Sequence, residues 1–297
     1  MNKAVSFISR FYRYQSERFP VLVILATLAP ALASSGAVAL GTLSWGPFAT
    51  ALVVSLLYLF HIRALDERRD FGHDTVHHAA RPMQTGLITR AELARADFVA
   101  VLGILGLALW AGPAAFAYAA FALLYAHLAG NEFFLGERLR ERYFLYNAVN
   151  LVQMLLMQVL VYALFSGWFV VTPLIVAHFA FTSTGTLILE FVRKLKIPGE
   201  DGPGKDTYTH YLGFSASLVI HASLILVNVL LFIRLMAFAG GSSSLATLVA
   251  VFFTALSVFL ALAHYAKPRR VTEVLLQLAF VVGYGVMNVM VAFAILG

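Results

Sequence analysis

The sequence has no cysteine and few charged residues for its length. Only 12% of its 297 residues are Asp, Glu, Lys or Arg, which is about half the share found in soluble globular domains. The absence of cysteine excludes disulfide bonds and metal sites with thiolate ligands. Hydrophobic residues make up 61% of the chain. Because a bilayer core of about 30 Å needs about 20 apolar residues per helix, this composition predicts an integral membrane protein.

Apolar runs of spanning length recur along the whole chain, separated by short turns rich in Gly, Pro and Ser. They predict an all-α, polytopic membrane protein with nine transmembrane helices, at residues 21–43, 47–65, 92–111, 113–130, 145–166, 169–191, 209–234, 243–266 and 272–296. Residues 1–20 are basic and aromatic and lack the cleavage pattern of a signal peptide. We therefore expect them to form an interfacial N-terminal helix.

Charged residues gather on one side of the predicted membrane spans. All of the 21 Lys and Arg residues except Arg234 lie near the N-terminus or in the segments 63–95, 138–142, 193–205 and 267–270, and the 15 acidic residues lie on the same side. By the positive-inside rule this side is the cytoplasm. We expect the host membrane to be the bacterial cytoplasmic (inner) membrane. Topology thus accounts for the basic charge, and we expect no nucleic-acid partner. A transporter would usually carry ionisable groups near the bilayer midplane, so the asymmetry favours an enzyme.

Acidic residues recur every four positions at the end of the second span. Asp66, Asp70 and Asp74 would share one face of a helix. Such carboxylates repel one another unless a cation lies among them, and Mg²⁺ carrying a phosphate-rich ligand suits this position. The alternative is a solvated helix end in which Asp70 and Asp74 pair with Arg68 and Arg69.

Together with the residues that follow it, this segment resembles the first motif of the UbiA superfamily of intramembrane prenyltransferases, Asn-Asp-x-x-Asp-x-x-x-Asp and then Arg-Pro-Leu-x-x-Gly. The matching positions are Asp66, Glu67, Asp70, Asp74, Arg81, Pro82, Met83 and Gly86. The resemblance implies one domain over residues 1–297, a nine-helix bundle around a central cavity, with motif loops at 66–90 and 190–208. It also implies that Asp66, Glu67, Asp70 and Asp74 hold Mg²⁺, while Arg81 binds the diphosphate.

A second polar group follows the sixth span, where the family carries its second Asp-rich motif. The match is imperfect, because Lys194 and Ile197 occupy positions that are usually Asp. Only Asp201 matches a motif Asp, and Glu190 is a neighbouring acid. We expect Glu190 and Asp201 to bind metal, and Lys194 to supply positive charge directly. The alternative is an ordinary basic loop at the anionic leaflet.

Other polar residues near the same side are expected to contact the substrate. The complete set is Arg81, Arg142, Asn147, Asn150, Lys194, Lys205, Asp206 and Tyr208. For the arginines at 138–142, pairing with Glu137 and Glu141 is an equally good interpretation. His73, His77 and His78 have a spacing that would permit zinc binding, although loop histidines of this kind are usually ordinary surface residues.

These observations predict an enzyme that uses Mg²⁺ to ionise an allylic prenyl diphosphate and transfers the prenyl group to an unknown lipophilic acceptor. The prenyl tail would stay in the lipid bilayer, which explains why such a site would lie in a membrane protein. Two alternatives stay open. One is an intramembrane UbiA-type terpene cyclase that acts on a prenyl diphosphate alone, and the other is a non-enzymatic lipid-binding or transport protein.

Overall fold

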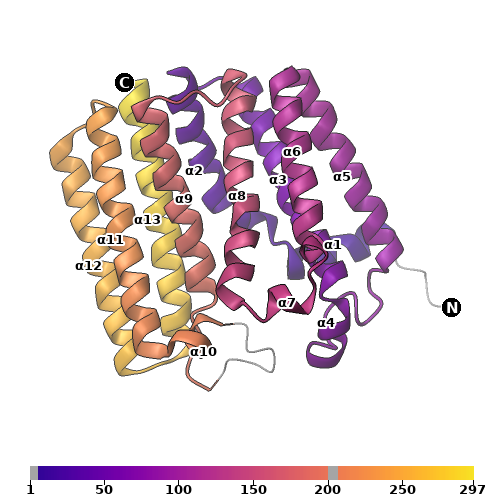
Figure 1. The fold of residues 1–297 in the computed structure, drawn as a ribbon. Coiled ribbons are helices and arrows are strands. Elements are labelled where there is room, and N and C mark those ends of the chain that lie inside the picture. Colours follow the sequence, from indigo (N-terminus) through magenta and orange to yellow (C-terminus); the bar gives the residue numbers. More distant parts are fainter. Residues whose placement is uncertain (1–5, 200–206) are drawn as a thin grey trace. The chain divides into compact units, whose positions relative to one another are not determined.

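The computed structural model describes residues 6–199 and 207–297, and these ranges are helical with no β-strand (Figure 1). The helices in chain order are α1 (Phe7–Arg18), α2 (Val21–Leu40), α3 (Trp45–Arg69), α4 (Phe71–His77), α5 (Arg90–Ala111), α6 (Pro113–Gly130), η1 (Glu132–Phe134), α7 (Glu137–Arg140), α8 (Tyr143–Ser166), α9 (Pro173–Arg193), α10 (Tyr208–Leu212), α11 (Phe214–Phe238), α12 (Ser243–Ala266) and α13 (Arg270–Leu296).

Within these described ranges, nine helices are long and apolar enough to cross a membrane: α2, α3, α5, α6, α8, α9, α11, α12 and α13. This confirms the predicted all-α class and the predicted number of spans, and the chain is an integral membrane protein. The seventh predicted span, 209–234, is displaced in the structure. Gly213 has a φ of 80°, a left-handed conformation that glycine adopts without strain. The chain therefore breaks there into the short helix α10 and the spanning helix α11.

The described chain forms two compact units. The first unit contains the residues up to Leu25 together with Ala49–Trp168, and the second contains Ala26–Phe48 together with Phe169–Gly297. Each is described separately below.

In the first unit, α6 packs against both α5 and α8 (Figure 1). The start of α5 is fixed by a capping box, in which Thr89 and Glu92 satisfy each other's free backbone N–H groups. The turn into α6 uses Gly112, with a φ of 144°, followed by Pro113 at the first helical position. Proline is favoured there because it has no N–H to leave unpaired.

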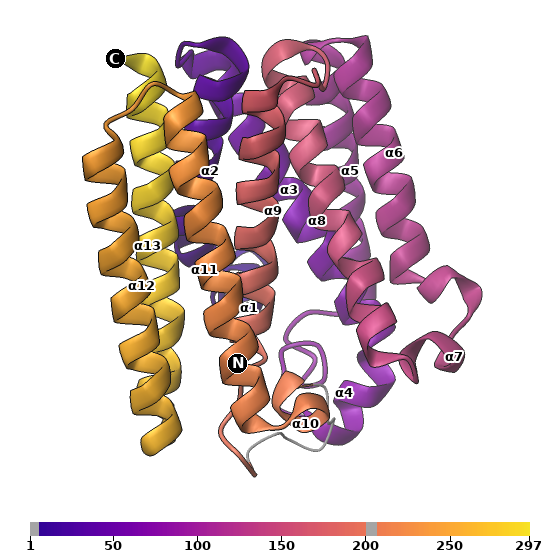
Figure 2. The same ribbon diagram turned by 60° about the vertical axis from the view of Figure 1, so that its left-hand side comes forward.

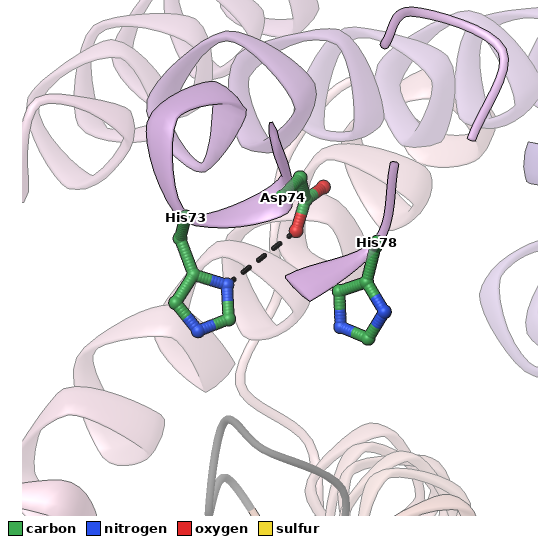
Figure 3. A group of neighbouring side chains, drawn as sticks. All are labelled: His73, Asp74 and His78. Atoms are coloured by element: carbon green, nitrogen blue, oxygen red, sulfur yellow. Dashed lines mark ion pairs between the residues drawn. The ribbon is translucent and has the colours of Figure 1, made fainter. Parts of the chain in front are cut away.

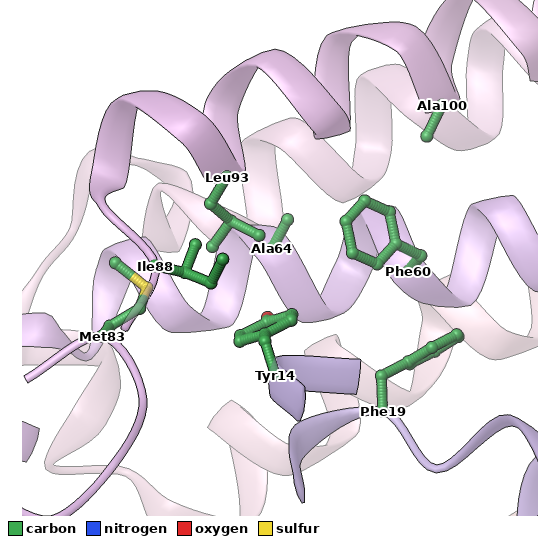
Figure 4. Packing of buried hydrophobic residues seen from close by; sticks show 8 residues of the cluster. All are labelled: Tyr14, Phe19, Phe60, Ala64, Met83, Ile88, Leu93 and Ala100. Atoms are coloured by element: carbon green, nitrogen blue, oxygen red, sulfur yellow. The ribbon is translucent and has the colours of Figure 1, made fainter. Parts of the chain in front are cut away.

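The N-terminal helix α1 is held against this unit by an apolar cluster (Figure 4). Tyr14 is fully buried and lies beside the side chains that α3, α5 and the preceding turn contribute, namely Phe60, Ala64, Met83, Ile88, Leu93 and Ala100. Arg10 adds a salt bridge of 2.5 Å to Glu92 at the start of α5. Burial raises the pKa of the Tyr14 phenol. Helix α1 is therefore a packed part of the unit.

In the second unit, α11 packs against both α9 and α12, and α13 packs against α9 and α12 (Figure 2). Buried polar side chains link these helices. The Ser34 hydroxyl donates to Asn288 Oδ1 at 2.6 Å and lies 2.8 Å from His178 Nε2, while Asn228 donates to the Phe181 carbonyl at 2.8 Å. Hydrogen bonds of this kind hold transmembrane helices together in lipid.

A close approach between α9 and α13 generates a stability prediction. A Cβ atom at Gly185 would overlap the ring of Tyr284, which is itself stacked on Phe280 and packed against Phe181. Overpacking costs about 1–3 kcal/mol, so Gly185→Ala should lower the apparent melting temperature in detergent. Gly106→Ala is the matched control, because nothing lies within 4 Å of its Cβ position. Equal melting temperatures for the two variants would contradict this packing.

Candidate functional site

The predicted acidic segment lies in the first unit, where α3 passes into α4. Asp70 lies between the two helices with φ −88° and ψ 3°. The helical hydrogen bonds nonetheless continue through the junction, from Asp70 N to Asp66 O at 2.9 Å and from Asp74 N to Asp70 O at 2.8 Å. The three acids therefore keep their one-turn spacing, although the helix that carries them is interrupted at Asp70.

A guanidinium group lies between the first two of these acids. Arg69 forms salt bridges of 2.9 Å to both Asp66 and Asp70. It is also 4.0 Å from Glu132 of η1, and it lies 5.5 Å from the ring centre of Tyr146 on α8. In this structure the positive charge between these two carboxylates thus comes from a side chain of the protein itself, Arg69.

Asp74 has different partners. Its Oδ2 atom accepts a hydrogen bond from Arg81 Nη1, and its Oδ1 atom is 3.6 Å from His73 Nδ1. Asp74 is 3% exposed, whereas the side chains of Asp66 and Asp70 are 32% and 35% exposed. The sequence motif therefore contains two environments, one carboxylate pair open to solvent and one buried carboxylate.

Glu67 has partners different from those of the three Asp residues. Its fully buried side chain is 2.7 Å from Arg18 of α1 and also pairs with Arg63, one turn earlier on α3. Of the pairs proposed for a simple solvated helix end, Arg69 with Asp70 is present, whereas Arg68 pairs with Asp97 on α5 at 2.8 Å. Glu67 thus joins α3 to α1, a role separate from the metal binding that the resemblance implies.

Arginines also line a solvent-open hollow of about 270 Å³ beside Asp74. We call it the arginine hollow, and its lining residues are Glu17, Arg18, His78, Ala80, Arg81 and Pro82. Arg81 faces it while remaining bonded to Asp74. A guanidinium has five N–H donors, so this arrangement leaves Arg81 able to bind an anion in the hollow without releasing Asp74.

The segment between α6 and α8, which contains η1 and α7, lies near the acidic segment through the contact of Glu132 with Arg69. Glu132, Phe133 and Phe134 all have positive φ, between 51° and 60°, which is costly for residues other than glycine. This left-handed turn directs the buried Glu132 carboxylate to Arg140 and towards Arg69.

Three of the predicted substrate-binding residues lie near the start of α8. Asn147 and Asn150 donate to the carbonyls of Tyr143 and Tyr146, at 2.7 and 2.9 Å. Arg142 is exposed and precedes the first residue of α8. Tyr146 lies one residue before Asn147, and the Arg69 guanidinium lies over its ring.

The second predicted group belongs to the second unit. Glu190 pairs with Lys194 at 2.9 Å and with Arg193 at 2.6 Å. Tyr208 stacks on Phe191 with ring centres 4.2 Å apart. Burial, followed by the nearby Glu190 carboxylate, raises the pKa of Tyr208 to about 12, so its phenol is neutral at physiological pH. The predicted site residues Asp201, Lys205 and Asp206 lie outside the described residues.

The donors of the first unit fit a hard divalent cation. Mg²⁺ takes oxygen ligands and usually keeps several waters. Asp66 and Asp70 present carboxylate oxygens one helical turn apart, both partly open to solvent and both already drawn to a positive charge. A metal ion there would replace the contacts that these oxygens now make with Arg69.

No family model matches this sequence, and no curated protein matches it by sequence. Solved structures do match its fold. A UbiA homologue from Aeropyrum pernix K1 superposes with a TM-score of 0.65 and 11% identity over 89% of this chain and 96% of that chain.

A UbiA homologue from Archaeoglobus fulgidus bound to DMAPP and Mg²⁺ gives a TM-score of 0.59 and 15% identity over 95% and 98% of the two chains. A digeranylgeranylglyceryl phosphate synthase structure gives 0.59 and 14% over 93% and 99%. This chain has the UbiA fold. The family resemblance predicted from the acidic motif is thereby confirmed at the level of the fold.

Sequence reasoning missed several side chains around the acids. Arg69 lies three residues after Asp66, but the sequence predicts it only as a partner of Asp70 or Asp74 in a solvated helix end. Glu132 and Tyr146 come from distant segments. Glu132 stands directly before two phenylalanines at the end of a predicted span, and this position is the sequence signal that could have identified it. Nothing in the local sequence marks Tyr146.

The position of Glu67 generates a prediction that separates a structural role from a metal-binding one. Glu67→Ala would leave Arg18 and Arg63 without their shared carboxylate. Breaking a buried pair costs about 3–5 kcal/mol, and we expect roughly the lower figure because both arginines are partly exposed. Thermal unfolding in detergent should show a clear loss of stability.

Asp66→Ala is the control for this measurement, and it should change the melting temperature less because its side chain is a third exposed. A Glu67→Ala protein of normal stability that no longer responds to Mg²⁺ would instead assign Glu67 to the metal site.

Proposed function

We propose that this chain is a member of the UbiA superfamily and a Mg²⁺-dependent intramembrane prenyltransferase. One observation carries the proposal: in a chain with the UbiA fold, acidic side chains one helical turn apart lie at the end of a membrane-length helix, and the next acid, Asp74, pairs with an arginine that lines a solvent-open hollow. The matching Archaeoglobus fulgidus protein was solved with DMAPP and Mg²⁺ and, separately, with GPP and Mg²⁺.

Asp66 and Asp70 are the metal ligands that the geometry supports best, with Asp74 beside them. Mg²⁺ bound to these carboxylates would offset the negative charge that develops on a diphosphate leaving group. Arg69 keeps the carboxylate pair compensated before a metal arrives. Its planar guanidinium can then stay close by, against the Tyr146 ring.

Arg81 and Arg18 are the proposed diphosphate-binding residues. Both line the arginine hollow, and each is anchored by a carboxylate, Asp74 for Arg81 and Glu67 for Arg18. Anchoring of this kind fixes the direction of a long side chain before the substrate binds, which lowers the entropic cost of binding. Donors fixed in advance are also the most effective at stabilising charge in a transition state.

The proposed reaction breaks the bond between the allylic carbon and the diphosphate oxygen. The electron pair leaves with the diphosphate, and the allylic cation is captured by a nucleophilic atom of a lipophilic acceptor, which then loses a proton. Exclusion of water protects this cation. The prenyl tail would lie among the membrane helices, with the acidic segment and the arginine hollow facing the cytoplasm as the charge distribution predicts.

A terpene cyclase is the second candidate, and the second polar group favours it. Among the described residues of that group, the single carboxylate of Glu190 is already neutralised by Arg193 and Lys194. A cyclase needs ionisation of only one substrate. Purified protein supplied with a prenyl diphosphate and Mg²⁺ alone should give no cyclic hydrocarbon or alcohol if the chain is a transferase.

Removing one carboxylate charge should greatly slow ionisation of the prenyl diphosphate. We expect Asp70→Asn and Asp74→Asn to reduce diphosphate release by at least about 100-fold, because a metal contributes several kcal/mol to stabilising the leaving group. The assay measures diphosphate released from prenyl diphosphates of different length, with membrane extract as the source of acceptor. Glu141→Gln is the control, since Glu141 is an exposed acid on the same side. Near-normal turnover in either Asp variant, with normal membrane insertion, would reject the metal role.

The arginine hollow generates a separate prediction. Arg81→Lys keeps the charge but loses the forked donor set that binds phosphate and Asp74 together. Turnover should fall by roughly tenfold or more, whereas Arg138→Lys, at an exposed position of α7, should leave it unchanged. Equal turnover in the two variants would show that Arg81 acts only as a point charge.

A further inference from the structure

Two histidines and one aspartate converge at the end of α4 (Figure 3). One ligand atom from each of His73, Asp74 and His78 lies within 4.8 Å of the others. His73 is exposed and His78 is partly exposed, so an ion can reach them from solvent, while Asp74 is buried behind them. His77, which lies between them in sequence, is outside this group.

The local backbone brings these residues together. His73 and Asp74 are consecutive in α4, and His78 ends that helix with φ −140° and ψ 46°. The His78 N–H bonds to the Asp74 carbonyl at 2.8 Å. His78 leaves the helical conformation directly after the last turn, and its side chain lies on the side occupied by His73 and Asp74, as Figure 3 shows.

The two oxygen atoms of the Asp74 carboxylate have different neighbours. Oδ2 is bonded to Arg81, whereas Oδ1 faces His73 Nδ1 at 3.6 Å. A metal ion can therefore bind Oδ1 while Arg81 keeps Oδ2. Arg81 also fixes the carboxylate from behind, as residues around metal ligands commonly do.

We propose that His73, Asp74 and His78 form a binding site for one divalent transition-metal ion, with Zn²⁺ and Co²⁺ as suitable occupants. Imidazole nitrogen suits these ions, whereas Mg²⁺ prefers oxygen ligands throughout. Zinc–nitrogen bonds of about 2.0–2.1 Å in a tetrahedral arrangement place ligand atoms roughly 3.4 Å apart. The ligand atoms now lie within 4.8 Å of one another, so binding one ion would draw them closer together.

This site differs in chemistry from the carboxylate site proposed for Mg²⁺, but it shares Asp74 with that site. A bound transition-metal ion would occupy Oδ1 of Asp74 and withdraw that atom from any other ligand. The inference does not depend on prenyl transfer, because the ion should bind in the absence of any prenyl diphosphate. Its failure and the failure of the proposed function are therefore distinguishable.

The test is Co²⁺ binding to detergent-solubilised full-length protein that carries no polyhistidine tag, followed by visible absorption. We expect one Co²⁺ per chain, displaced by Zn²⁺ and retained in a large excess of Mg²⁺. His73→Ala and His78→Ala should each weaken binding by at least about tenfold. His77→Ala is the matched control, because its ring lies 4.6 Å from that of His73 yet is not a ligand, and it should change the affinity less than twofold.

Three outcomes would overturn the proposal. They are the absence of saturable Co²⁺ absorption, wild-type affinity in both His73→Ala and His78→Ala, and an equal loss in His77→Ala. Circular dichroism of each variant checks that the helices are retained. Asp74→Asn, which keeps an oxygen at the same position, supplies a second variant that should weaken Co²⁺ binding with little change to the histidine pair.

Discussion

Compensation of carboxylate charge at the end of α3 is the constraint on which the rest of the first unit depends. Acids placed one turn apart beside a membrane would repel one another in a medium of reduced dielectric constant. In this structure each acid meets an arginine: Asp66 and Asp70 share Arg69, and Asp74 pairs with Arg81. The arginines come from the same short segment as the acids, so the charge balance in this structure is local.

The same rule explains why helix α1 belongs to the unit. Glu67 is fully buried and needs a positive partner. Arg63 provides one from the same helix, and Arg18 of α1 provides the other. Charge pairing and the burial of Tyr14 thus act together, and the helix that they hold in place is also the one that gives the arginine hollow its second arginine.

The sequence was sufficient to predict the helices but not the side chains that pair with the acids. Hydropathy predicts every membrane-length helix of the described ranges, since each span must be long and apolar to cross a bilayer. The displaced seventh span shows the limit, because the left-handed φ of Gly213 ends one helix inside an otherwise suitable run. Glu67 shows a second limit. One step along a helix turns a side chain by about 100°, so a residue adjacent to Asp66 in a motif can face another element entirely.

The left-handed turn at residues 132–134 has a consequence for how this protein responds to changes in charge. Each of its non-glycine residues is held in a conformation that costs roughly 1–2 kcal/mol. Attraction between the Glu132 carboxylate and the guanidinium groups of Arg140 and Arg69 opposes relaxation of this segment. An ion that draws Asp66 and Asp70 away from Arg69 would alter that balance of forces. We therefore expect the conformation of the connection between α6 and α8 to respond to what occupies the acidic helix end.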